Sequence, residues 1–281
     1  MYALKRLSGG KLALTREHEA IARPRHGSIA WSDFDPSQYQ RDDLDRAADL
    51  WRTRAVQELH SLALFTEICG KLQVLGAPLD WSGAFARMIG DEVRHTDLCL
   101  AMCEALGRPA APQIEASGLQ LLNGVSSRAA VRQMIVAAFC IGETISGRMF
   151  RRALKATTVP LARQVVAAIV ADETFHAELG WELGALLMRA DGAEHDAERA
   201  RLAEALPALF SHYAMLCGVT RGIGASAEQP IDTRPNFGTL SPHGYARAFF
   251  DGMSEDVVPG LVAIGLPEAE DAYARLLHSL G

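Results

Sequence analysis

The sequence predicts an all-α protein whose central part is a four-helix bundle, and three observations support this prediction. Hydrophobic residues make up 49% of the 281 residues and aromatic residues only 7%, with many Ala and Leu, a mixture typical of packed helices. Four long segments show the helical spacing of apolar residues. The lengths of the connections between these segments indicate two antiparallel hairpins joined by one long crossover.

The expected helices follow one another in a regular order. Residues 1–41 are expected to be irregular because turn-forming residues recur there. Four long helices are expected at about 42–76, 82–106, 128–155 and 161–190. The first has acidic residues in its first turn, where they interact favourably with the helix dipole. Short turns join the first helix to the second and the third to the fourth, so each pair is expected to form an antiparallel hairpin.

A longer connection, at 107–127, links the two hairpins. At roughly 3.3 Å per residue it is long enough to cross a bundle from end to end. Further helices are expected at about 194–217, 243–264 and 267–279, and no convincing strand is expected. The chain therefore divides into an irregular segment at 1–41, a four-helix core at 42–190 and a C-terminal helical extension at 191–281 that packs on the core. The loop at 218–242 has two interpretations, a lid over a pocket or a plain connection.

The bulk properties of the chain exclude several classes of partner. The net charge of −6 argues against nucleic acid or an anionic membrane as a partner. We expect neither a secretory signal nor a stretch that is long and apolar enough to span a bilayer. The five cysteines are scattered and odd in number, so we expect them to be reduced in a cytoplasmic protein.

One motif occurs twice, as DEVRHTDL from Asp91 and DETFHAEL from Asp172. Each copy places a Glu and a His three residues apart on one face of an apolar helix, Glu92 with His95 and Glu173 with His176. An ionised carboxylate on a buried helix face costs several kcal/mol, roughly, unless an opposite charge compensates it. A metal ion is one such charge, and donor sets rich in carboxylate with some imidazole suit iron or manganese.

The other two long helices each offer a further carboxylate. Glu143 is the only acidic residue in the third helix. In the first helix, Glu58 continues an apolar stripe, whereas Glu67 lies on a mixed face and is kept as the alternative ligand. Glu58 precedes Glu92 by 34 residues and Glu143 precedes Glu173 by 30, so the two halves of the chain match. The sequence therefore predicts a two-metal site with six ligands, namely Glu58, Glu92, His95, Glu143, Glu173 and His176.

These motifs resemble those of the ferritin-like diiron carboxylate proteins, and DEVRHTDL resembles the DExRH motifs of the soluble acyl-carrier-protein desaturases. The resemblance covers about 45–190. It implies that Asp91 and Asp172 each orient the metal-bound His of the opposite hairpin, since a ligating imidazole donates its other N–H to a carboxylate. Arg94 either joins this carboxylate network or is exposed. Family members that oxidise aryl amines have an additional His where this chain has Ile169.

The surroundings of the predicted ligands suggest where a substrate would bind. An apolar wall is expected from Leu62, Phe65, Phe139 and Ile169, and small residues at Gly142 and Gly147 leave room beside Glu143. Close packing of helices explains such small residues equally well. Ser146, one turn from Glu143, either delivers protons or bonds its own backbone.

Three functions are compatible with these features. The first is an O2-activating oxidase or oxygenase that uses two iron ions, or manganese with iron, to hydroxylate, desaturate or N-oxidise a small organic substrate. Such an enzyme takes electrons from an external donor such as a ferredoxin or a reductase, and a homodimer is the assembly considered. The second is an iron-storage, ferroxidase or peroxide-scavenging protein of the same fold. The third is a diiron hydroxylase of RNA or a helical scaffold without a site, and the acidic charge weighs against RNA.

Overall fold

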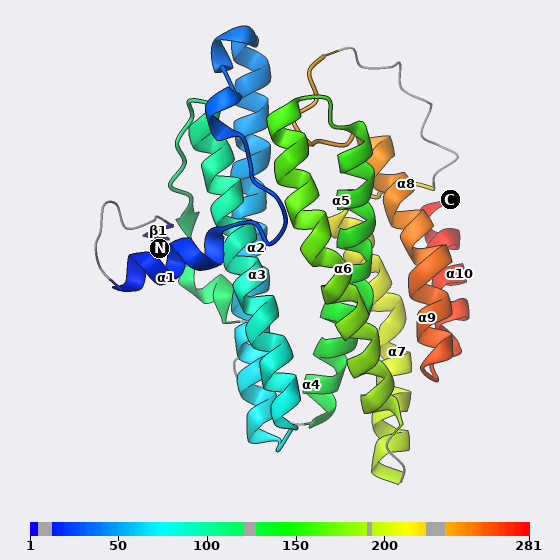
Figure 1. Ribbon diagram of the computed structural model, residues 1–281. Helices are drawn as coiled ribbons and strands as arrows, with labels where there is room; N and C mark the ends of the chain where they lie inside the picture. The colour runs from blue at the N-terminus through cyan, green and yellow to red at the C-terminus, as the bar shows by residue number, and fades with distance from the viewer. Residues whose placement is uncertain (5–12, 121–127, 190–192, 223–233) are drawn as a thin grey trace. The chain divides into compact units, whose positions relative to one another are not determined.

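The computed structural model describes residues 1–4, 13–120, 128–189, 193–222 and 234–281, and these residues are mostly helical, which confirms the all-α prediction (Figure 1). The chain forms two compact units. Unit one comprises Met1–Ser126, Thr157–Asp172 and Arg234–Thr239, and unit two comprises Ser127–Ala156, Glu173–Thr233 and Leu240–Gly281. The association of the four long helices in one bundle stays a prediction.

Unit one is built on the hairpin of α2 (Arg41–Val74) and α3 (Leu79–Ala105). Acidic residues in the first turn of each helix interact favourably with its dipole. Gly76 ends α2 at a φ of +78°, a conformation that glycine adopts without steric penalty. Large apolar side chains, among them Trp51 and Phe85, are fully buried in this unit.

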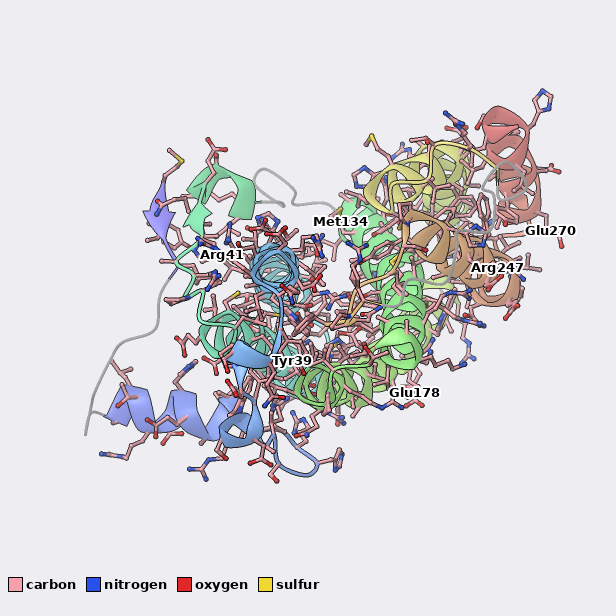
Figure 2. The ribbon with its side chains drawn as sticks, turned by 90° about the horizontal axis from the view of Figure 1, so that it is seen from above. Tyr39, Arg41, Met134, Glu178, Arg247 and Glu270 are labelled. Carbon is pink, nitrogen blue, oxygen red and sulfur yellow. The ribbon has the colours of Figure 1, made fainter. Side chains whose placement is uncertain are left out.

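Further elements surround this hairpin. Helix α1 (Ala13–Ala22) lies across α3 (Figures 1 and 2). Strand β1 (Tyr2–Ala3) pairs with β2 (Gln113–Ile114) in a two-stranded antiparallel sheet. Helix α6 (Pro160–Met188) contributes its first part, up to Asp172, to the same unit.

Unit two begins with one long helical stretch that changes its hydrogen-bond pattern. It consists of α4 (Arg128–Ile135), a π-helical segment (Val136–Glu143) and α5 (Thr144–Ala156). The second part of α6 follows, and the remaining elements are α7 (Ala193–Leu216), α8 (Pro242–Gly252), a second π-helical segment (Met253–Val257), α9 (Val258–Ala263) and α10 (Glu268–Leu280). Seen from above, Glu178 lies on the outer side of α6 (Figure 2). The core of the unit includes Phe210 and Phe249, both fully buried.

The secondary structure differs from the sequence-based expectations in three respects. Segment 1–41, expected to be irregular, contains α1, whose Ala-rich sequence favours a helix and which packs on α3. Residues expected to contain no strand form β1 and β2, which are too short to show alternating hydropathy. The third long helix contains the unexpected π-helical segment. Parts of the predicted crossover, at 121–127, and of the 218–242 loop, at 223–233, lie outside the described residues.

One helical stretch bears on the expected absence of a membrane span. Arg128–Ala156 is long and apolar enough to cross a membrane, so the expectation that no stretch would meet this test was wrong. In the structure, 67% of its most apolar 18-residue window is buried, as in a core helix of a soluble protein. A cytoplasmic location stays a prediction. All five cysteines are free, as expected.

Candidate metal centre

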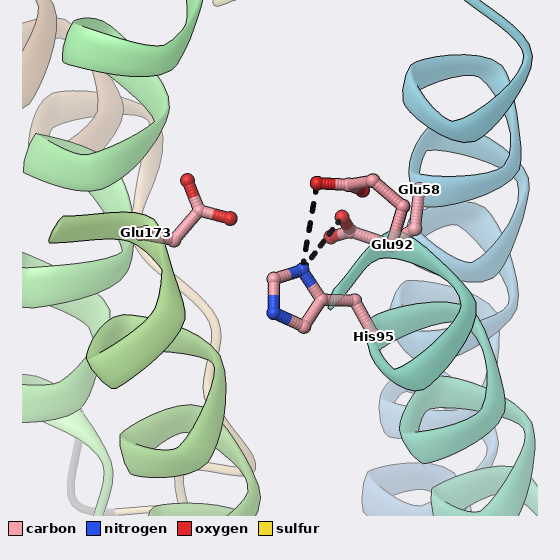
Figure 3. A group of neighbouring side chains, drawn as sticks. All are labelled: Glu58, Glu92, His95 and Glu173. Atoms are coloured by element: carbon pink, nitrogen blue, oxygen red, sulfur yellow. Dashed lines mark ion pairs between the residues drawn. The ribbon is translucent and has the colours of Figure 1, made fainter. Parts of the chain in front are cut away.

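Unit one contains the first triad of predicted ligands, Glu58, Glu92 and His95. All three side chains are buried, and His95 is completely inaccessible to solvent. The Nδ1 atom of His95 lies 3.6 Å from Oε2 of Glu58 and 3.8 Å from Oε1 of Glu92. One ligand atom from each residue lies within 4.8 Å of the others, so the three groups point toward a common centre (Figure 3).

The hairpin of unit one explains this convergence. Glu92 and His95 are one turn apart on α3, which places them on the same helix face. Glu58 comes from α2 and continues a buried stripe that includes Trp51, Ala55 and Phe65. The alternative ligand, Glu67, is half-buried and does not belong to either group of potential ligands found among the described residues.

Electrostatics favours the ionised form of Glu58. Burial by itself raises the pKa of this carboxyl group, but a hydrogen bond and the charge of His95 lower the pKa. A hydrogen bond with Glu92 and the positive charge of Arg54 act in the same direction, and the net pKa lies below its ordinary value. An anionic carboxylate is the form that binds a metal ion.

Unit two contains the second triad, Glu143, Glu173 and His176. The three side chains are again buried, and one ligand atom from each lies within 4.8 Å of the others. The Nδ1 atom of His176 lies 3.2 Å from Oε2 of Glu143 and 4.0 Å from Oε1 of Glu173. The two triads therefore have the same composition, two glutamates and one histidine.

The π-helical segment positions Glu143, its last residue. Such segments insert an extra residue into a helix and change the direction of the side chains that follow. The hydroxyl group of Tyr213 on α7 donates a hydrogen bond of 2.6 Å to the carbonyl of Ala137 within the segment. A Cβ atom at Gly142 would lie 2.8 Å from Tyr213 Oη, so glycine there permits the close approach of Tyr213. Burial, together with the charge of Glu143, raises the pKa of the Tyr213 phenol.

Both triads pass a simple chemical test as metal sites. Each offers two carboxylates and one imidazole, a donor set that suits iron or manganese. Because ionised carboxylates are expensive to bury, an opposite charge is needed near each pair. A divalent cation would balance the two carboxylate charges of either triad. The buried clusters of acid and histidine residues can therefore hold a metal ion, as the sequence predicted.

The chain was also compared with known proteins. Searches against protein-family models, curated proteins and solved structures gave no match. The case for metal binding therefore depends on the residues of this chain and on their geometry.

A network of aspartate and arginine residues lies behind the first triad. Nε2 of His95 is 3.4 Å from Oδ2 of Asp172, the contact expected from the family resemblance. Arg94 donates hydrogen bonds to Asp91 and Asp172, at 2.7 and 2.8 Å. Burial raises the pKa of Asp172, but the hydrogen bond with His95 lowers it, and with the charges of His95 and Arg94 the net pKa is below its ordinary value. Of the two alternatives for Arg94, the structure places it in the network.

Two residues of this region were not found from the sequence. Arg25 donates hydrogen bonds of 2.9 and 2.6 Å to Asp91, and its Nε lies 3.4 Å from Asp172. The carbonyl of Arg23 accepts a hydrogen bond from Arg94 Nε. Both lie in a stretch interpreted as a turn. Helical periodicity relates residues within one helix, so it cannot connect a turn with a helix more than 60 positions away. The one available signal was chemical, because two buried aspartates need cationic partners.

The residues predicted to form a substrate pocket occupy different environments. Phe65, Phe139 and Ile169 are fully buried, and Ser146 is half-buried. The space beside Gly142 contains the hydroxyl group of Tyr213, and a Cβ atom at Gly147 would lie 3.2 Å from the Arg151 guanidinium. Leu62 lines a cavity beneath α1.

Proposed function

We propose that this protein is an O2-activating non-haem dimetal oxidase or oxygenase that acts on a small organic substrate. The observation that carries the proposal is the repeated triad, two buried sets of two glutamates and one histidine on long helices. In this proposal the two triads together hold two iron ions, or manganese with iron, in one dinuclear centre of the ferritin-like type. The reaction would be a hydroxylation, a desaturation or an N-oxidation.

The continuity of α6 supports a single centre. Asp172, which contacts His95 of the first triad, is followed directly by Glu173 of the second triad. One helix therefore carries both a group that orients a ligand of the first triad and a ligand of the second. In each half of the chain a His follows a Glu by three residues and another Glu lies about 30 positions upstream, as in the ferritin-like pattern.

The side chains of the protein have three tasks in this function. When bound, two ferrous ions would supply the electrons with which O2 is activated. Asp172 holds His95 by its Nε2 atom, so that Nδ1 is directed to Glu58 and Glu92. Arg94 donates a hydrogen bond to Asp172 and holds its carboxylate in place. Buried apolar residues such as Phe65 and Phe139 exclude water from their surroundings.

The remaining components of the proposal concern partners. Two electrons per turnover would come from an external donor, a ferredoxin or a reductase, because each cycle must return the metal ions to their reduced form. The acidic net charge favours a small-molecule substrate over nucleic acid. We place the enzyme in the cytoplasm, with a homodimer as the assembly to be tested.

The metal content of the protein tests the proposal. We expect about two metal ions per chain, measured by mass spectrometry on protein from cells supplied with iron and manganese. Glu92→Ala and His176→Ala should each reduce this content, because each removes a ligand from one triad. Glu67→Ala is the matched control, since it removes a carboxylate of α2 that lies outside both triads. Consumption of O2 by the reduced protein should fall in the same two variants.

Other results would contradict this function. Many irons per chain would favour the alternative of an iron-storage or ferroxidase protein. An absence of bound metal, even after anaerobic addition of ferrous iron, would refute the metal site itself. If Glu67→Ala reduces the metal content and Glu58→Ala does not, the ligand from α2 is wrong.

A further inference from the structure

The segment Arg234–Thr239 belongs to unit one, although the residues that follow it in the chain belong to unit two. The side chain of Asn236 organises this segment. Its Oδ1 atom accepts hydrogen bonds of 2.8 and 3.0 Å from the N–H groups of Gly238 and Thr239. An Asn side chain that bonds the backbone two residues further on stabilises a tight turn. The segment therefore folds into a compact turn of its own.

This segment binds the chain at the start of α6. The carbonyl of Asn236 accepts hydrogen bonds of 3.1 Å from the N–H groups of both Thr158 and Val159. The N–H group of Asn236 donates a hydrogen bond of 2.8 Å to the hydroxyl group of Thr158. Thr158 and Val159 directly precede Pro160, the first residue of α6. The three hydrogen bonds therefore fix the entry of the chain into α6.

The same segment also binds α2. Nε1 of Trp51 donates a hydrogen bond of 3.0 Å to the carbonyl of Phe237, and Nη2 of Arg54 donates one of 2.6 Å to the carbonyl of Gly238. Both donors belong to buried side chains, and the Arg54 guanidinium lies 4.9 Å from the centre of the Trp51 ring. A hydrogen bond from a charged donor is stronger than one between neutral groups. The segment therefore connects α2 with α6.

At Gly238 the segment meets both helices. Its φ of +100° is a conformation that glycine adopts without steric penalty. A Cβ atom there would lie 3.1 Å from Val166 Cγ2 of α6, and 3.2 and 3.3 Å from atoms of Arg54 and Trp51 of α2. Optimal contacts between carbon atoms are roughly 3.5 to 4.0 Å long. A larger residue at this position would therefore push the segment away from the helices.

His95 lies between groups of the same two helices. Its Nδ1 is 3.6 Å from Oε2 of Glu58 on α2, and its Nε2 is 3.4 Å from Oδ2 of Asp172 on α6 (Figure 3). Arg54 precedes Glu58 by about one helical turn, and Val166 precedes Asp172 by about 9 Å along α6. The segment thus joins α2 and α6 within about two turns of the groups that face the two nitrogens of His95.

We propose that Asn236 and Gly238 are positioning residues of the first triad, because the segment that they form holds α2 against α6 and sets the separation of Glu58 and Asp172 across His95. A ligating imidazole is oriented by the partner of its other nitrogen, so this separation determines where the ring points. The described end of the 218–242 loop is then neither a lid nor a plain connection. The role in metal binding rests on the proposed function, whereas the effect on His95 exists in the metal-free protein.

The test compares Gly238→Ala with Gly265→Ala in the full-length protein. Gly265 has a φ of +99°, but a Cβ atom there would have no atom within 4 Å. Both substitutions therefore introduce similar backbone strain, and only Gly238→Ala displaces the segment. NMR of the metal-free protein with ¹⁵N-labelled histidine should show shifted His95 ring signals in Gly238→Ala and unchanged ones in Gly265→Ala. The His95→Gln protein assigns these signals.

Anaerobic titration with Co²⁺ gives the second readout. Gly238→Ala should weaken Co²⁺ binding about tenfold, the lower end of the effect of groups that orient a ligating histidine, and should change the absorption spectrum of the bound Co²⁺. Gly265→Ala should do neither. Circular dichroism shows whether each variant is folded.

A second pair of variants tests the turn itself. Asn236→Ala removes the acceptor of the Gly238 and Thr239 N–H groups and should shift the His95 signals and weaken Co²⁺ binding in the same way. Asn236→Asp keeps an acceptor oxygen at this position and should restore most of the affinity. If Gly238→Ala does not fold, this pair decides the question by the same two readouts.

Three results would overturn the proposal or its parts. Unchanged His95 signals and Co²⁺ affinity in a folded Gly238→Ala protein would show that the segment does not position the triad. An equal loss in Gly265→Ala would assign the effect to general destabilisation. A wild-type protein that binds no Co²⁺ would refute the proposed function, and the His95 signals would then decide alone whether the segment positions this histidine.

Discussion

The two triads contain the same residue types, but the protein positions them by different means. The first lies on two regular α-helices, and a network of buried charges, Asp172 with Arg94 and Arg25, holds its histidine. The second has Glu143 at the end of a π-helical segment, which neighbouring helices hold through hydrogen bonds, among them that of Tyr213 on α7. The geometry of the first triad thus depends on electrostatics, and that of the second triad on the backbone of a π-helical segment. The same substitution strategy should therefore affect the two halves differently.

The largest effect is expected from Arg94→Met. Arg94 is buried and donates to two buried aspartates, so its loss leaves them with only the partly exposed Arg25 as a hydrogen-bonded cationic partner. Breaking such a buried charge network by removing one partner destabilises a protein by about 3–5 kcal/mol. Urea unfolding, followed by circular dichroism, measures the change.

Arg87→Met is the matched control for this prediction. Arg87 also faces Asp91, at 3.8 Å, but its side chain is 41% exposed, so a change of less than about 1 kcal/mol is expected. If Arg94→Met and Arg87→Met lower the free energy of unfolding equally, the hydrogen bonds of Arg94 to the two aspartates do not stabilise the protein as expected.

Local patterns in the sequence predicted the long helices and the residues that group in the two triads. The spacing of apolar residues repeats within a few positions, so the ends of α2 and α3 were predicted to within about three residues. The same periodicity selected Glu58, because it lies in the buried stripe of α2, whereas Glu67 is half-buried. Such patterns depend on one helix at a time and need no knowledge of its partners.

Features that depend on distant residues were not predicted. A π-helical segment differs from an α-helix by one inserted residue, which leaves the apolar pattern of Val136–Glu143 nearly unchanged. Tyr213 contacts this segment from another helix, and no pattern in the sequence links it to Glu143. Arg25 is separated from Asp91 by 66 positions, and Asp91 itself was recognised only by resemblance. In each case the determining contact is tertiary, and no periodicity within a single segment contains it.

A smaller effect is expected from Tyr213→Phe, which tests the second half of the molecule. The substitution removes the hydroxyl group that donates to the Ala137 carbonyl and leaves that buried acceptor without this partner. A loss of about 1–3 kcal/mol in the free energy of unfolding is expected. If the hydroxyl group also maintains the π-helical segment, the metal affinity of the protein should fall with it.

Tyr245→Phe is the control, since Tyr245 is a half-buried tyrosine of α8 outside the segment. Stability is measured by urea unfolding and metal affinity by anaerobic titration with Co²⁺, whose absorption reports on its ligands. A Tyr213→Phe protein that is as stable as Tyr245→Phe would show that the π-helical segment does not need the hydrogen bond from Tyr213.

The smallest change in stability is expected from Arg25→Gln, which makes the comparison between the halves sharpest. The Arg25 side chain is 35% exposed, and Arg94 remains in place to compensate the aspartates, so the free energy of unfolding should change by less than about 1 kcal/mol. Metal affinity is a different matter, because groups that orient a ligating histidine typically change affinity by about 10- to 100-fold. Arg25 acts on His95 through Asp172, one step further away, and the lower end of that range is expected.

Titration with Co²⁺ again provides the measurement, and Arg25→Lys keeps the charge while losing the two-pronged contact with Asp91. Partial rescue by lysine would show that charge matters more than geometry. If Arg25→Gln leaves the affinity for Co²⁺ unchanged, Arg25 only holds the N-terminal segment against α3. The electrostatic half of the comparison would then depend on Arg94 alone.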